Sequence, residues 1–163
     1  MSTINRSQVT HSPDETRSLA FELARSARGG DLIFLIGDLG AGKTTFVRGF
    51  VEGLGHPEPR EVSSPTFAIH HIYEGGRLRV HHLDLYRLES DGQMGVQGVL
   101  DPLDDASAVC LVEWSEYLPA GTRKPSLCVE LSDLAPHAHE DRMITLSFQD
   151  ASTATRFFPH GSL

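Results

Sequence analysis

Residues 37–44, Gly-Asp-Leu-Gly-Ala-Gly-Lys-Thr, match the pattern G-x-x-x-x-G-K-[ST] at every fixed position. The preceding residues 32–36 form a continuous apolar run, which is typical of a central parallel strand covered on both faces. The following residues, from about 43 to 54, are expected to form a helix that ends at Gly55. A strand that leads through a glycine-rich turn into a helix is the context this pattern requires, so we expect an α/β domain built around the turn.

The residue types in this segment suit a triphosphate and its metal ion. Glycine lets successive backbone N–H groups point into one concavity, and the following helix adds the positive end of its dipole. We expect Lys43 to reach the β- and γ-phosphates of a nucleotide and the Thr44 hydroxyl to bind Mg²⁺. The residues predicted to contact the nucleotide here are Asp38, Leu39, Gly40, Ala41, Gly42, Lys43, Thr44 and Thr45.

Two acidic residues are candidates for the metal side of the site. Asp84 ends the run 79–83, and Glu113 ends the more apolar run 108–112. Ligands of α/β sheets gather at the carboxyl ends of strands, so both residues are suitably placed. We favour Glu113 as the metal-side carboxylate, directly or through water. Asp84 is then expected either to support the metal ligands from behind or to orient the attacking water. The sequence leaves open which of the two orients the attacking water.

Residues 63–66, Ser-Ser-Pro-Thr, lie between the predicted helix and the next predicted strand. A segment that responds to the γ-phosphate could stand there, with a hydroxyl such as that of Thr66 meeting the metal or the phosphate. Local turn chemistry favours the alternative, which is a serine–proline turn with no ligand role.

The rest of the chain fits one domain, residues 1–163, with a tail from about 150 of uncertain structure. Ser12, Pro13 and Glu15 predict the start of a helix that ends at residues 29–30. Residues 66–73 and 78–84 predict two strands joined at Gly75-Gly76 by a two-residue hairpin turn, and further strands are expected at 108–112, 127–131 and 143–148. Residues 89–105 are expected to be irregular to helical. The predicted fold is a three-layer α/β P-loop NTPase domain, with a mainly parallel sheet, an added β-hairpin and antiparallel strands.

Composition narrows the classes of partner. The formal net charge is −8, so a phosphate backbone would meet a repulsive field, which disfavours direct binding of DNA or bulk RNA. Residues 1–10 are polar, and no segment has the unbroken apolar length that crosses a bilayer. We therefore expect a cytoplasmic protein with no membrane contact.

The nucleotide and the reaction can also be narrowed. Guanine-specific P-loop proteins usually have an N-K-x-D segment, whereas the only asparagine here is Asn5 near the terminus, so ATP is favoured. A small-molecule kinase would need an arginine-bearing lid, and Arg123, Arg142 and Arg156 are isolated in the sequence. A kinase and a nucleotide-gated binding protein that scarcely hydrolyses remain the alternatives to an ATPase.

Four motifs together resemble the TsaE (YjeE) family. They are Gly-Asp-Leu-Gly-Ala-Gly-Lys-Thr-Thr at 37–45, Ser-Pro-Thr-Phe at 64–67, His-Leu-Asp-Leu-Tyr-Arg at 82–87 and Leu-Val-Glu-Trp at 111–114. The resemblance implies a Mg²⁺-dependent ATPase, slow without partners, that works with TsaB and TsaD in threonylcarbamoyladenosine modification of tRNA beside the anticodon. Contact with tRNA would then be indirect, through the complex.

The resemblance also implies roles for particular residues. Lys43 and Thr44 match the phosphate and Mg²⁺ positions, Thr66 the switch threonine, Asp84 the essential aspartate and Glu113 the metal-associated glutamate. Trp114 matches a family tryptophan near the site. Adenine contacts are expected from Thr16 and Arg142. Ser115 departs from the family, in which proline commonly follows the Glu-Trp pair, and this puts the local turn in doubt.

Overall fold

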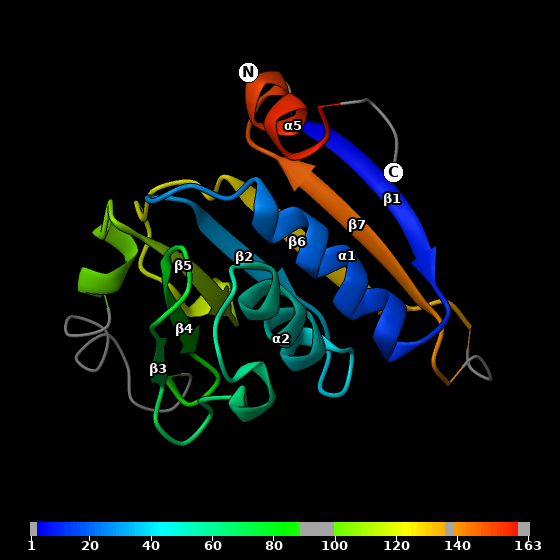
Figure 1. Ribbon diagram of the computed structural model, residues 1–163, viewed down its shortest axis with the longest axis horizontal. Helices are drawn as coiled ribbons and strands as arrows, with labels where there is room; N and C mark the ends of the chain where they lie inside the picture. Colours follow the sequence, from blue (N-terminus) through cyan, green and yellow to red (C-terminus); the bar gives the residue numbers. More distant parts are fainter. Residues whose placement is uncertain (1–2, 89–99, 136–138, 160–163) are drawn as a thin grey trace.

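A single mixed sheet with helices packed on it forms the molecule (Figure 1). The computed structural model describes residues 3–88, 100–135 and 139–159. The strands are β1 (Ile4–Thr10), β2 (Leu32–Ile36), β3 (His70–Tyr73), β4 (Arg79–Asp84), β5 (Ala108–Glu113), β6 (Leu127–Asp133) and β7 (Arg142–Phe148). The α-helices are α1 (Pro13–Arg25), α2 (Lys43–Gly53) and α5 (Ala151–Phe157), and the 3₁₀ turns are η1 (Pro59–Glu61), η3 (Asp101–Asp104) and η4 (Ser115–Tyr117).

The seven strands lie in the order β1-β7-β6-β2-β5-β4-β3. Strands β6, β2, β5 and β4 pair in parallel, whereas β1 with β7, β7 with β6 and β3 with β4 pair antiparallel. The predicted α/β class is therefore confirmed. The expectation of a mainly parallel sheet was too strong, because the parallel part is confined to the four central strands.

Apolar side chains cover both faces of this sheet. Helices α1 and α2 lie side by side on one face, where their residues pack against β2, β5 and β6, and α5 adds Phe157 to the same cluster. On the opposite face, a smaller cluster combines Leu83 and Val112 with Leu103 of η3. Because the described α-helices all join the first cluster, the three-layer P-loop assignment stays a prediction.

The predicted start of α1 is confirmed. The Ser12 hydroxyl accepts a hydrogen bond from the Glu15 N–H at 3.2 Å, and the Glu15 carboxylate accepts one from the His11 N–H at 2.8 Å. The first bond satisfies a donor that the first helical turn leaves without a partner, and the second ties the residue before the cap to the helix. The helix ends at Arg25, before residues 29–30, where it was predicted to end.

The predicted two-residue hairpin turn is wrong. Tyr73 pairs with Val80, so five or six residues connect β3 to β4. The His56 ring bonds to the carbonyls of Glu74 and Leu78 at 2.9 and 3.1 Å, which fixes this connection against the end of α2. Residues 66–69 also lie outside β3, because the Ile69 N–H bonds back to the Pro65 carbonyl and closes a turn.

Two elements had not been predicted. Strand β1 is polar and pairs on one side only, with β7, so its sequence has no apolar run. Helix α5 is a short helix capped by Asp150, whose carboxylate accepts from the Thr153 N–H at 2.8 Å. The prediction for residues 89–105 falls largely on 89–99, which lie outside the described residues. None of the described helices is both long and apolar enough to span a bilayer.

Candidate functional site

The glycine-rich loop between β2 and α2 is a tight backbone cradle. Gly40 and Gly42 have φ angles of 80° and 105°, a left-handed region that other residues rarely adopt. A Cβ on Gly37 would lie 2.6 Å from the Leu131 carbonyl oxygen and 2.9 Å from the Ala41 Cβ. Backbone geometry thus explains the two fixed glycines of the pattern, Gly37 and Gly42, and also Gly40. The loop ends at the amino terminus of α2, where N–H groups are available to an anion.

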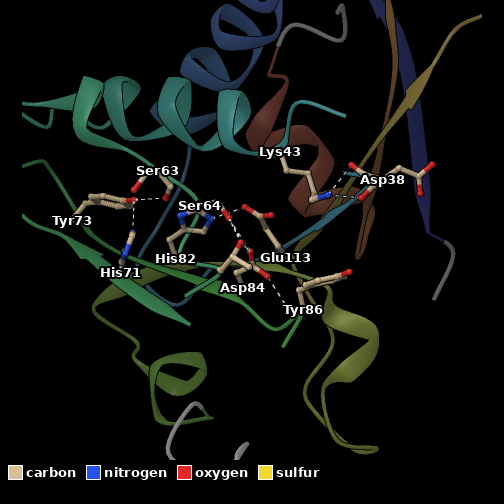
Figure 2. Close-up of polar contacts among 12 residues, drawn as sticks. Asp38, Lys43, Ser63, Ser64, His71, Tyr73, His82, Asp84, Tyr86 and Glu113 are labelled. Atoms are coloured by element: carbon tan, nitrogen blue, oxygen red, sulfur yellow. Dashed lines mark hydrogen bonds and ion pairs between the residues drawn. The ribbon is translucent and has the colours of Figure 1, made fainter. Parts of the chain in front are cut away.

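Lys43 is a nearly buried cation, with 6% of its surface exposed. Its ammonium donates to the carbonyls of Gly37 and Asp38, and it lies 4.9 Å from the centre of the Trp114 ring (Figure 2). Among the described residues, no carboxylate lies within ion-pair distance of it. A buried ammonium with only neutral acceptors is suited to bind an anionic group such as phosphate.

Asp84 and Glu113 lie side by side at the ends of two central strands. They are partners in the parallel pairing of β4 with β5, and each is at most 3% exposed. Residues paired in this way project from the same face of a sheet, so both carboxylates face the P-loop side. This register places the two acidic residues side by side at the strand ends, and their roles toward a metal stay predictions.

Each carboxylate has its own donors. Oδ2 of Asp84 accepts from the hydroxyls of Ser64 and Thr66 at 2.8 and 2.6 Å, and its Oδ1 accepts from the Tyr86 N–H at 3.0 Å. The segment 63–66 is therefore held on Asp84, which connects the predicted switch to the site. Oε1 of Glu113 lies 2.8 Å from Nε2 of His82, a contact that was not anticipated from the sequence.

These groups line one cavity of about 350 Å³ beside the P-loop. It contains the predicted lysine, the predicted Mg²⁺ threonine, both carboxylates and the switch hydroxyls. A larger cavity of about 780 Å³ lies between β1, α1 and α5, and none of the predicted site residues lines it. The smaller cavity is lined by Leu39, Gly40, Gly42, Lys43, Thr44, Thr45, Ser64, Thr66, Asp84, Tyr86, Glu113 and Trp114.

The two residues expected near adenine lie in different places. Arg142 contacts the P-loop backbone, donating to the carbonyls of Ala41 and Gly40 at 3.0 and 3.3 Å. Arg142 also lines a second cavity beside the P-loop, of about 680 Å³. Thr16 is 3% exposed, and its hydroxyl is 2.8 Å from that of Thr10. Thr16 lines neither that cavity nor the one at Lys43. Arg142 thus supports the loop, Thr16 is packed apart from it, and an adenine contact by either stays a prediction.

Trp114 has a backbone conformation that is unusual for a large residue. Its φ is 59°, and its ring lies 5.0 Å from that of Tyr86 as well as beside Lys43. Left-handed residues other than glycine tend to be found where function requires a particular geometry. Ser115 follows as the first residue of η4, so the turn is formed without the proline common in the TsaE family.

Comparisons with known proteins identify the family of the chain. A sequence model of the family described as "Threonylcarbamoyl adenosine biosynthesis protein TsaE" matches residues 10–144. Similar proteins with the name tRNA threonylcarbamoyladenosine biosynthesis protein TsaE include that of Bacillus subtilis, 46% identical over 67% of this chain, that of a Nostoc species, 37% over 72%, and that of Rickettsia felis, 32% over 88%. The alignments span 66%, 71% and 82% of the lengths of those three relatives.

The fold has a solved counterpart. The crystal structure of Bacillus subtilis YdiB superposes with a TM-score of 0.74 at 29% sequence identity and covers 99% of both chains. The match includes the segments that form the P-loop and the two carboxylate strands. By its sequence and its fold, the chain belongs to the TsaE family.

Proposed function

We propose that this chain binds ATP with Mg²⁺ and hydrolyses it, as the ATPase that acts with TsaB and TsaD in threonylcarbamoyladenosine modification of tRNA. The observation that carries the proposal is a single cavity that joins the P-loop lysine and threonine to two buried carboxylates. The names of the relatives place them in biosynthesis of the same modified nucleoside. The second cavity beside the P-loop, of about 680 Å³, also joins it to acidic residues, Glu116, Glu130 and Asp133, but neither Lys43 nor Thr44 lines it.

Different residues of the cavity would bind the phosphates, hold the metal ion and orient the water. The P-loop N–H groups would bind the phosphates together with Lys43, whose ammonium has only the carbonyls of Gly37 and Asp38 as hydrogen-bond acceptors among the described residues. The Thr44 hydroxyl and Glu113 would hold Mg²⁺, whose charge, when it is bound, offsets that of the phosphates. Asp84 or Glu113 would orient the water that attacks the γ-phosphate.

The cavity supports slow hydrolysis by the chain alone. No arginine is among the described residues that line it. Arg123 bonds to the carbonyls of Leu103 and Gly30, and Arg156 is paired with Asp31. Enzymes of this chemistry often receive an arginine from a partner, which can raise the rate by about 10³–10⁵-fold. With a net charge of −8, contact with tRNA would come through the complex.

Binding and hydrolysis should respond to the partners in a measurable way. Calorimetry with Mg²⁺ and ATP should give saturable heat with the isolated chain, and phosphate release should rise by about tenfold or more when TsaB and TsaD are added. No heat with well-folded protein, or full turnover without partners, would contradict the proposal. Transfer of phosphate to a metabolite in place of water would establish the kinase alternative. If ATP bound with measurable heat but was not hydrolysed even in the complex with TsaB and TsaD, the binding-protein alternative would be established.

Trp114 offers a direct optical signal, because it is the only tryptophan and its ring contacts Lys43. Binding of Mg·ATP should draw the ammonium toward the phosphates and change the environment of the ring. We expect a saturable change in tryptophan fluorescence on titration with Mg·ATP and none on titration with magnesium alone. An unchanged spectrum at nucleotide concentrations that saturate the calorimetric signal would remove Trp114 from the immediate surroundings of the phosphates.

A further inference from the structure

His82 is a fully buried histidine whose ring contacts Glu113. It lies in β4, where its strand partner on β5 is Leu111, two residues before Glu113. Side chains two residues apart on a strand share a face, so His82 and Glu113 meet on the P-loop side of the sheet. The adjacent His81 projects from the opposite face, where its Nε2 lies 2.9 Å from the Asp105 carboxylate. Only one of the two neighbouring histidines can therefore influence the site.

The surroundings of His82 fix which nitrogen holds the proton. Nε2 is 2.8 Å from Oε1 of Glu113, while Nδ1 is buried and has no partner among the described residues. A buried N–H without an acceptor is costlier than a bare acceptor nitrogen. A neutral ring with its proton on Nε2 satisfies both conditions, so His82 donates to the carboxylate.

Glu113 depends on this single donor. Asp84, its neighbour across the strands, receives three donors, whereas Glu113 receives only the His82 N–H within the described part of the chain. Two like charges opposite each other in a sheet repel unless each is stabilised. With Oε1 bonded to His82, Oε2 is the oxygen left to face the cavity.

The ring of His82 has an aromatic neighbour on β3. The Tyr73 ring lies 6.2 Å from it, and the Tyr73 hydroxyl donates to the Ser63 carbonyl at 3.3 Å (Figure 2). The phenol is protonated at neutral pH and so keeps that bond, and burial raises its pKa further. Strand β3 and the first residue of the switch segment 63–66 are thereby linked through Tyr73, next to the ring of His82.

We propose that His82 is the positioning residue for Glu113, holding one carboxylate oxygen by its Nε2 proton so that the other is directed to the metal side of the nucleotide site. This inference rests on the proposed function, in which Glu113 is the metal-side carboxylate. It explains why a fully buried histidine stands two residues before Asp84 with one nitrogen unpartnered. Partners of this kind that orient a metal-binding carboxylate typically contribute about 10–100-fold to metal affinity or activity.

The test uses the full chain with TsaB and TsaD. In His82→Leu, which cannot donate, the magnesium concentration for half-maximal ATP hydrolysis should rise about 10–100-fold. His82→Gln can place an amide N–H where Nε2 stands and should recover most of that loss. His81→Leu is the matched control, because it removes a buried histidine–carboxylate contact from the same strand on the opposite face. It should leave the magnesium dependence unchanged.

Two readouts do not depend on turnover. Calorimetric titration of Mg²⁺ into the protein with a non-hydrolysable ATP analogue should show the same order of affinities among the variants. In the nucleotide-free protein, the nitrogen chemical shifts of His82, assigned by their loss in His82→Gln, should be those of a neutral ring protonated on Nε2. Glu113→Gln should move them.

The outcomes separate the possible failures. A folded His82→Leu with wild-type magnesium dependence, an equal loss in His81→Leu, or a His82 ring protonated on Nδ1 would overturn the role of His82 alone. Absence of magnesium-dependent heat in the wild type would overturn the proposed function, and the metal-side role of His82 with it. Thermal unfolding of each variant shows whether a loss comes from unfolding.

Discussion

Replacing Lys43 with alanine should reduce ATP hydrolysis by about 10²–10³-fold or more, the scale of removing one preorganised group that stabilises transition-state charge. Lys43 is the only lysine that lines the cavity, and it is nearly buried, so bulk water cannot substitute for its charge. The loss should appear as a lower turnover number in the complex with TsaB and TsaD. Phosphate release at saturating ATP measures it.

The fold should survive this change. Lys43 donates to the carbonyls of Gly37 and Asp38 and contacts the Trp114 ring, so its removal breaks no ion pair among the described residues. Lys124 is the chain's only other lysine and is exposed, so Lys124→Ala is the matched control and should hydrolyse ATP at the wild-type rate. If a folded Lys43→Ala protein hydrolysed ATP normally, the proposed site would be wrong. A pull-down of TsaB or TsaD with each variant in the presence of ATP would show whether loss of hydrolysis is accompanied by loss of partner binding.

The centre of the fold was predictable because several local signals agree there. A continuous apolar run marks β2, the glycines mark the turn, and an amphipathic pattern marks α2. Strand β5 is also fully buried and therefore has the same kind of run. Because parallel strands place their carboxyl ends at one edge, the convergence of Asp84, Glu113 and the P-loop followed from the strand assignments alone.

The missed elements have no such signal. The sequence of β1 is polar because it is an edge strand, and its existence depends on the backbone of β7. Residues 66–69 are β-rich by composition, yet Ile69 adopts a φ of 66°, a costly conformation for a β-branched residue that the surrounding loop imposes. Propensity gives way to tertiary contacts in both cases.

Side-chain contacts within the site could not be predicted from neighbouring residues in the sequence either. The contact of His82 with Glu113 depends on the register between β4 and β5, because a shift of one residue would turn His82 to the other face. The bonds of Arg142 to the P-loop join residues about a hundred positions apart in the chain. A histidine two residues before Asp84 was the one available hint for the first contact, and the second had none.

Replacing Gly49 with alanine should destabilise the protein by about 3 kcal/mol or more, although the same change in an exposed helix interior would stabilise it by about 1 kcal/mol. Gly49 lies in α2 where the helix crosses α1, and an added Cβ would be 2.3 Å from the Arg17 carbonyl oxygen and 2.7 Å from its Cα. Those atoms belong to the backbone of a helix, so they cannot move aside as a flexible side chain could. The midpoint of thermal unfolding should fall by roughly 10 °C.

Two further variants decide whether the close approach of the helices is the cause. Gly53→Ala should behave similarly, since its Cβ would be 2.4 Å from the Phe21 carbonyl oxygen, whereas Ser18→Ala on the exposed side of α1 should change stability by less than about 0.5 kcal/mol. If Gly49→Ala were as stable as the wild type, the packing of α1 on α2 would be looser than described. Because α2 begins at Lys43, any displacement of α2 by this clash also moves the P-loop lysine and threonine. A folded Gly49→Ala protein should therefore also bind Mg·ATP more weakly, as measured by calorimetry below its unfolding temperature.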